Sequence, residues 1–282
     1  MLRAGYFSLL LLSTAFALQC NDDTIRGVNL GGWLLLEPWI TPSIFEEVNE
    51  VAGENRGKIV DEYTYAQYVD PVFYQERLNR HWDEFYQKSD LEILASVGIS
   101  HIRIPYGHWF FDVAEDEPYP PPPQTDDQGM RFYLKRMLGW ADELGMKVLM
   151  DLHGAPGSQN GFDNSGKRGD IHFQDGDKPD RAARVLGQMS QLMKDWIDEG
   201  VMRPETLAGI EFLNEPFGWF EPVWQAVRDK FYYAGYEEIR RVFPDESVPI
   251  ALQTGFRDFS EYDNYMQPPV STVFKKKSHF QR

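Results

Sequence analysis

The residues most able to do chemistry follow a short apolar run at 207–213, where the chain reads Asn214-Glu215-Pro216. Such a run is typical of a buried parallel strand. Enzymes built on eight-stranded β/α barrels carry their catalytic groups at the carboxyl ends of the strands, so Asn214 and Glu215 are expected at a barrel mouth. A carboxylate there could act as a general acid or base. Taken alone, however, the motif favours an ordinary loop start for Glu215, so further signals are needed.

Other predicted strands also end in polar residues that a sugar site could use. The first leads to Asn29 and Glu37, the second contains Arg103 between apolar neighbours, and the third ends at Asp151 and His153. An arginine that faces a barrel interior needs a carboxylate partner, because an unpaired buried charge is costly. Viewed alone, Arg103 fits a core ion pair as well as a catalytic role, and a lone His153 is more often structural or a metal ligand.

The elements that must position these residues alternate along the chain. From residue 24 onward, strand-like apolar runs are separated by longer helical patterns, which predicts parallel strands joined by crossover helices. The candidate strands are 24–30, 101–105, 147–153, 207–213 and 248–254, and the candidate helices are 85–97, 131–144, 185–196 and 231–242. The fold class is therefore α/β.

Two connections are longer than a minimal loop. The proline run at 118–123 is expected to be an extended, solvent-facing stiff spacer. The segment 154–180 is rich in Gly, Asn and Asp and follows the third strand at the active face of a barrel. Long loops at that face concentrate functional residues, so this segment is a candidate substrate-binding loop.

Composition and charge limit the partners. The 282 residues are 42% hydrophobic and 15% aromatic, which fits one large domain with many flat rings. The apolar face of a sugar ring can stack on such rings. A net charge of −16 repels nucleic acid and anionic lipid, so no nucleic-acid partner is expected and a neutral substrate is favoured.

The N-terminus predicts a secretory signal peptide over residues 1–17. Arg3 precedes a short apolar stretch and the small-x-small cleavage pattern at Ala15 and Ala17. The stretch is too short to span a bilayer, so no membrane partner is expected after cleavage. Cys20 is the one cysteine, which leaves a free thiol or a partner in a longer chain. The predicted location is secreted, extracellular or in a cell wall.

Four strand-end motifs occur together and in order. They are the Asn-Leu-Gly-Gly-Trp-Leu-Leu-Leu-Glu-Pro-Trp-Ile run that begins at Asn29, Ile-Arg-Ile-Pro around Arg103, the Asp-Leu-His-Gly run from Asp151 to Gly166, and Leu-Asn-Glu-Pro around Glu215. From about Ile25 to about Gln267 the chain resembles the fungal exo-β-1,3-glucanases of glycoside hydrolase family 5. The resemblance implies a TIM-type (β/α)8 barrel with about the first five β/α units present, and an enzyme without cofactor or metal that removes glucose from the non-reducing ends of β-1,3-glucan with retention.

The resemblance also implies a role for each matching residue. Glu215 would be the general acid/base, with Asn214 on the sugar 2-hydroxyl, where a hydrogen bond tightens in the transition state. The other implied roles are sugar binding and carboxylate positioning for His153, contact with the nucleophile for Arg103, hydroxyl binding at the terminal glucose for Glu37, and the entrance of the site for Phe162 and Asn164.

The chain departs from the family pattern near its C-terminus. Retaining enzymes need a second carboxylate about 5 Å from the first, and the relatives carry it in a Gly-Glu-Trp motif that is absent here. We expect a C-terminally truncated partial barrel over 18–267, monomeric if folded, and a divergent, basic, disordered tail over 268–282. Open sheet edges predict aggregation or partial disorder, and Arg103 is expected to lack its carboxylate. Negligible release of glucose from laminarin is therefore predicted.

Two alternatives stay open at this point. The first is an inactive product or a remnant that binds glucan without cutting it, which retention in a laminarin gel without turnover would reveal. The second is a related β-glucosidase that acts on β-1,6-glucan or a glucosyl lipid. Glu37 and the loop that carries Phe162 favour the exo-β-1,3-glucanase.

Overall fold

A parallel five-stranded sheet forms the centre of the molecule. The computed structural model describes residues 24–122, 125–262 and 265–266, so the predicted signal peptide, Cys20 and the predicted tail over 268–282 lie outside the described residues. The strand order is β1-β2-β3-β4-β5, with bounds Gly27–Asn29, His101–Gly107, Lys147–Gly154, Leu207–Glu211 and Ile250–Ala251. Sequence neighbours are sheet neighbours, as in consecutive β/α units of a (β/α)8 barrel. The predicted partial barrel of about five units is confirmed.

The strand register follows the apolar pattern. Ile102 pairs with Val148, and Ile210 pairs with Ile250, all with buried side chains. Within the described residues, β1 and β5 each pair with one strand, and they are shorter than predicted, with three and two residues. A strand with one neighbour makes half as many ladder hydrogen bonds as a central strand, which accounts for the short lengths of β1 and β5.

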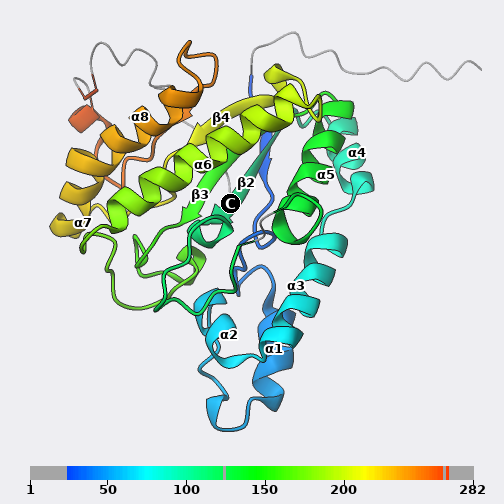
Figure 1. Cartoon of the computed structure of the whole chain (residues 1–282), viewed down its shortest axis with the longest axis vertical. Coiled ribbons are helices and arrows are strands. Elements are labelled where there is room, and N and C mark those ends of the chain that lie inside the picture. The colour runs from blue at the N-terminus through cyan, green and yellow to red at the C-terminus, as the bar shows by residue number, and fades with distance from the viewer. Residues whose placement is uncertain (1–23, 123–124, 263–264, 267–282) are drawn as a thin grey trace, which may run out of the picture.

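Helices connect the strands (Figure 1). They are α5 (Gly129–Glu143) after β2, α6 (Lys178–Asp198) after β3, and α7 (Glu221–Ala226), the π-helical turn Val227–Phe231 and α8 (Tyr232–Val242) after β4. The long helix α6 packs against α8 and buries an apolar face that includes Val185, Leu186, Met189 and Met193. It starts seven residues before the predicted 185–196 because Pro179 near its first turn favours helix initiation. None of the helices in the described residues is long and apolar enough to cross a membrane.

A helical segment between β1 and β2 was largely missed by the sequence prediction. It contains α1 (Pro42–Val51), α2 (Glu62–Tyr68), α3 (Pro71–Glu84) and α4 (Lys88–Ser96), where one helix at 85–97 was expected. The first three lie below the sheet in the view of Figure 1. The sequence does carry local signals for two of these helices: the side chains of Asp61 and Asp70 cap the first turns of α2 and α3. Single 3-10 turns lie at Gly53–Asn55, His108–Phe110, Asp163–Ser165, Pro204–Thr206 and Phe259–Tyr262.

The proline run is not the purely solvent-facing spacer that was predicted. Tyr119 within it is 5% exposed, and its ring stacks on Trp109 with centroids 4.2 Å apart and an interplanar angle of 8°. Stacking and burial anchor this loop to the turn that follows β2. The prediction failed because it was based on the prolines alone, and their pattern does not show that Tyr119 is buried.

A buried carboxylate joins the helical segment to the loops that follow β1 and β2. Glu62 at the start of α2 accepts hydrogen bonds from the Leu36 backbone N–H at 2.7 Å, from Trp109 Nε1 at 3.0 Å and from the Tyr74 hydroxyl at 3.2 Å. Burial dominates over these donors and raises the pKa of Glu62 to about 7. Between pH 4.5 and about 7, Glu62 is therefore protonated in the folded chain and ionised in the unfolded chain.

Glu62 is expected to make the fold less stable as the pH rises. A carboxyl whose pKa is raised on folding disfavours the native state between its unfolded and folded values, here from about 4.5 to about 7. The loss approaches about 3 kcal/mol, at 1.36 kcal/mol per pKa unit. Urea unfolding of Glu62→Gln, which stays neutral, should lack this fall relative to the wild type across the same pH range. Parallel stability curves for the two proteins would contradict the prediction.

Candidate active site

Arg103 on β2 lies at the centre of a cluster of polar side chains from neighbouring strands. Its Nε donates to Glu211 Oε2 at 2.7 Å and its Nη2 to Glu211 Oε1 at 2.9 Å. The Asp151 carboxylate lies 2.8 Å from the same Nη2, and Asn29 Oδ1 accepts from Nη1 at 3.0 Å. β3 and β4 supply the two carboxylates, and register pairs Asp151 with Glu211. A bidentate arginine between two buried carboxylates is a rigid arrangement.

This cluster corrects one prediction. Arg103 was expected to lack a carboxylate, but it is paired with both Asp151 and Glu211. Burial opposes the charge on Arg103, yet the two carboxylates outweigh it and raise its pKa. Burial likewise opposes the charge on Glu211, but Arg103 outweighs it and lowers the pKa of Glu211. Within the described residues, the charge of Arg103 is therefore balanced by the carboxylates of Asp151 and Glu211.

Asn214 and His153 extend the cluster to the ends of β3 and β4. Asn214 Oδ1 accepts from Arg103 Nη2 at 3.0 Å, so the Asn214 amide nitrogen is turned to His153 Nε2, 3.2 Å away. His153 Nε2 then accepts, and Nδ1–H donates to Asp151 at 2.5 Å. Burial opposes a charge on His153, but the Asp151 carboxylate raises its pKa. If His153 Nε2 were protonated, it would be a donor facing the Asn214 amide, which is also a donor, and the hydrogen bond between them would be lost.

Two glutamines that were not singled out from the sequence hold the strand ends. Gln159 Nε2 donates to the carbonyls of His153 and Asn214, at 2.7 and 2.9 Å. Gln253 Nε2 donates to Glu211 at 2.6 Å, and its Oε1 accepts from the Glu215 backbone N–H at 3.0 Å. Gln253 lies near the end of the predicted strand 248–254, and Gln159 lies in the polar loop after β3. These positions are the signals that could have found them.

Glu215 lies just beyond this cluster, as predicted for a residue at a strand end. Its side chain is half-buried, and its Oε2 accepts from Asn164 Nδ2 at 3.3 Å. Asn160 in turn donates to Asn164 Oδ1 at 3.3 Å, so the loop after β3 orients the amide toward the carboxylate. The backbone of Glu215 has a φ of +43°, a strained left-handed conformation for a residue with a side chain. Such strain persists at sites where surrounding contacts fix the chain.

Glu37 and Phe162 lie at the margins of the site. Glu37 Oε1 accepts from the Gly32 backbone N–H at 3.0 Å, and its charge contributes to the raised pKa of Arg103 and of His153. Phe162 is 43% exposed and meets Phe217 edge-on at 6.1 Å between centroids. The structure thus joins Arg103, His153 and Asn214 directly, and Glu215 with Asn164, while Glu37 and Phe162 lie outside these two groups in the described part of the chain.

The fold and the cluster together define an α/β protein of the (β/α)8-barrel type with a polar site at the carboxyl ends of its strands. The crystal structure of rutinosidase from Aspergillus niger matches it with a TM-score of 0.67 at 21% identity, over 84% of this chain and 64% of that one. This likeness supports the fold.

The sequence is similar to curated glucan 1,3-beta-glucosidases. It is 37% identical over 250 residues to that of Blumeria graminis, covering 89% of this chain and 53% of the relative. It is 38% identical over 246 residues to glucan 1,3-beta-glucosidase I/II of Saccharomyces cerevisiae, covering 86% and 52%. The chain thus spans about half the length of the curated relatives it matches. No model of a protein family matches the chain. The names of these relatives agree with the predicted exo-β-1,3-glucanase resemblance.

Proposed function

We propose that the chain is a glycoside hydrolase of the exo-β-1,3-glucanase type in family 5, with Glu215 as its acid/base. The observation that carries the proposal is the half-buried Glu215 carboxylate, held by Asn164 beside the cluster of Arg103, Asn214 and His153. A protonated Glu215 gives its proton to the glycosidic oxygen, and the carboxylate then activates water. The similarity to glucan 1,3-beta-glucosidases supports β-1,3-glucan as the substrate.

The neighbours of Glu215 bind and orient the sugar in this proposal. One hydrogen of the Asn214 amide faces His153, which leaves the second for the oxygen of the 2-hydroxyl. Arg103 fixes the Asn214 carbonyl and so prevents the amide from turning over. Glu37 accepts hydrogen bonds from the terminal glucose, and the Phe162 ring stacks on the next one. No cofactor takes part.

The remaining assignments are proposals of the same kind. Residues 1–17 form a signal peptide, 18–267 form the partial barrel and 268–282 form a tail, and the protein is secreted and monomeric. By the family resemblance, the partner of Glu215 in a retaining pair would come from a Gly-Glu-Trp motif, which the 282 residues do not contain. The purified chain is therefore expected to release negligible glucose from laminarin, and clear release would contradict this assignment.

Sugar binding tests the proposed site independently of turnover. Phe162→Ala removes an exposed ring and is expected to weaken binding of laminaritriose about tenfold, equivalent to about 1.4 kcal/mol. Phe162→Tyr, which keeps the stacking face, should bind like the wild type. Isothermal titration calorimetry measures both affinities. Equal affinity for the alanine and wild-type proteins would place the sugar elsewhere.

A further inference from the structure

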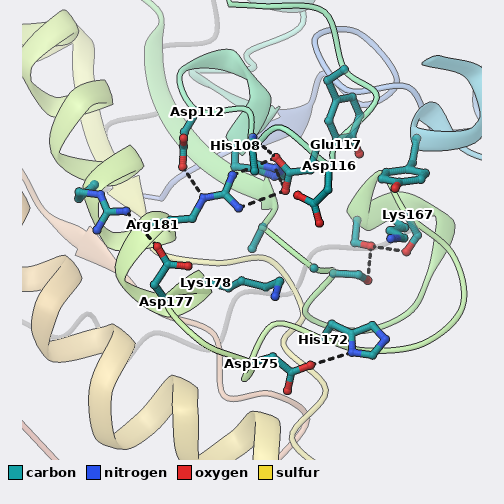
Figure 2. Close-up of a pocket in the computed structure, with 18 residues that line it drawn as sticks. His108, Asp112, Asp116, Glu117, Lys167, His172, Asp175, Asp177, Lys178 and Arg181 are labelled. Atoms are coloured by element: carbon teal, nitrogen blue, oxygen red, sulfur yellow. Dashed lines mark hydrogen bonds and ion pairs between the residues drawn. The ribbon is translucent and has the colours of Figure 1, made fainter. Parts of the chain in front are cut away.

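A pocket separate from the predicted sugar site lies against the loop that follows β3. It has a volume of 580 Å³ and is lined by the loops after β2 and β3, the start of α6 and Tyr63 (Figure 2). None of the seven residues predicted for the sugar site lines this pocket. The two sites share one loop, because Asn164 donates to Glu215 while the adjacent Ser165 lines the pocket. Small-molecule sites typically enclose about 300–1,000 Å³, so the pocket has a suitable size.

One wall of the pocket is a rigid network. Arg181 at the start of α6 donates to Asp112 at 2.7 Å and to Glu117 at 2.9 Å, and His108 Nε2 lies 3.2 Å from Glu117. Arg181 is 8% exposed and His108 is 2% exposed. Burial opposes the charge on Glu117, but His108 and Arg181 outweigh it and lower the pKa of Glu117. The polar atoms of this wall are therefore fixed before any ligand arrives.

Other polar groups of the pocket have no protein partner. The side chains of Asp116 and Lys178 make no hydrogen bond or ion pair within the described residues, and Figure 2 shows both extending into the open centre. His108 Nδ1 likewise has no hydrogen-bond partner in the described chain, but this atom is buried away from the open space of the pocket. Asp116 is exposed and Lys178 is half-buried, so both side chains are free to contact a ligand. An acceptor, Asp116, and a donor, Lys178, are thus available to one ligand.

The charge balance indicates a neutral ligand. Four basic side chains line the pocket against five carboxylates, and several of these charges are paired with each other. Such a lining has no net field that would favour a phosphate or a metal ion. A ligand with many hydroxyl groups can use donors and acceptors together, since each hydroxyl both donates and accepts.

We propose that this pocket is a second carbohydrate-binding site, which holds a neutral β-1,3-gluco-oligosaccharide without cleaving it. The identity of the sugar rests on the proposed function, whereas the pocket and its unpartnered groups do not. Asp116 accepts and Lys178 donates hydrogen bonds to hydroxyls on opposite sides of the ligand. The loop over 155–177 borders both sites, so a glucan bound in the pocket contacts the same loop that orients Asn164 toward Glu215.

Calorimetry and NMR with laminaritriose test the proposal on the full chain. The wild type is expected to bind two molecules, and the double variant Asp116→Asn with Lys178→Met is expected to bind one. The matched control Lys194→Met, on the exposed part of the same helix, should still bind two. In the wild type the amide signals of Gly157 and Gly176 should shift, and in the double variant they should not.

Each result decides for or against the second site. One bound molecule in the wild type with shifts at Glu215 and Phe217 alone overturns it, as does binding of two molecules by the double variant. Free glycine serves as a zwitterionic probe. If it shifts the amide signals of Gly157 and Gly176 and laminaritriose does not, the proposal is also overturned. Shifts at Gly157 and Gly176 without shifts at Glu215 and Phe217 support the pocket and count against the proposed function, so the two failures are distinguishable.

Discussion

Arg103→Met is expected to lower the free energy of unfolding by about 3–5 kcal/mol, the usual cost of removing one partner from a buried ion pair. The side chain of Arg103 is 12% exposed and holds two carboxylates, with side chains that are 0% and 6% exposed for Asp151 and Glu211. Methionine fills similar space but leaves both anions without their cation. Urea unfolding at neutral pH measures the loss.

A matched exposed arginine provides the control for this experiment. Arg241 on α8 pairs with Glu238, and its side chain is 68% exposed. Exposed ion pairs contribute about 0–1 kcal/mol, so Arg241→Met should leave the unfolding curve nearly unchanged. A loss for Arg103→Met as small as that for Arg241→Met would show that water reaches the cluster and replaces the guanidinium.

The pH dependence of the same variant has a definite sign. Arg103 lowers the pKa of Glu211, so in the wild type this pair contributes stability above the unfolded pKa of Glu211 and loses it as the pH falls through the folded value. The variant lacks this contribution. The difference in stability between wild type and variant should therefore shrink in acid, where protonated carboxyls no longer need a cation.

How far the sequence predicts this site depends on the range of each interaction. The three central strands were placed to within about two residues, because a buried parallel strand is a local apolar run. Glu215 and His153 therefore lie close to the ends of β4 and β3, as expected. The need of Arg103 for a carboxylate was also predicted. Its actual partner Glu211 is 108 residues away, and no linear pattern shows that register brings the two together.

The helical segment before β2 was missed although its sequence signals are local. Its helices are fixed by caps and prolines and by aromatic contacts such as that between Tyr65 and Phe45, at 5.8 Å between centroids. Apolar periodicity is weak in short helices, so a search for it found one helix where four exist. The capping residues Asp61 and Asp70 carried the missing information.

Glu215→Gln is expected to have the largest effect on chemistry, provided that the missing nucleophile is supplied. Azide added to the chain can attack the anomeric carbon from the α face while the bond to the leaving oxygen breaks and Glu215 protonates that oxygen, giving α-glucosyl azide. With phenyl β-glucoside, whose leaving group needs the proton, Glu215→Gln should lower the azide-dependent rate about 10²–10⁴-fold. Chromatography of the glucosyl azide measures it.

The leaving group separates proton donation from a structural role of Glu215. Dinitrophenolate leaves without a proton, so Glu215→Gln should change turnover of 2,4-dinitrophenyl β-glucoside little. Glu221→Gln, an exposed carboxylate at the start of α7, should change neither rate. Equal losses with both substrates would mean that glutamine disturbs the strained backbone of Glu215, with its φ of +43°. Because glutamine retains the shape and can still face Asn164, a loss confined to the poor leaving group can come only from the absent proton.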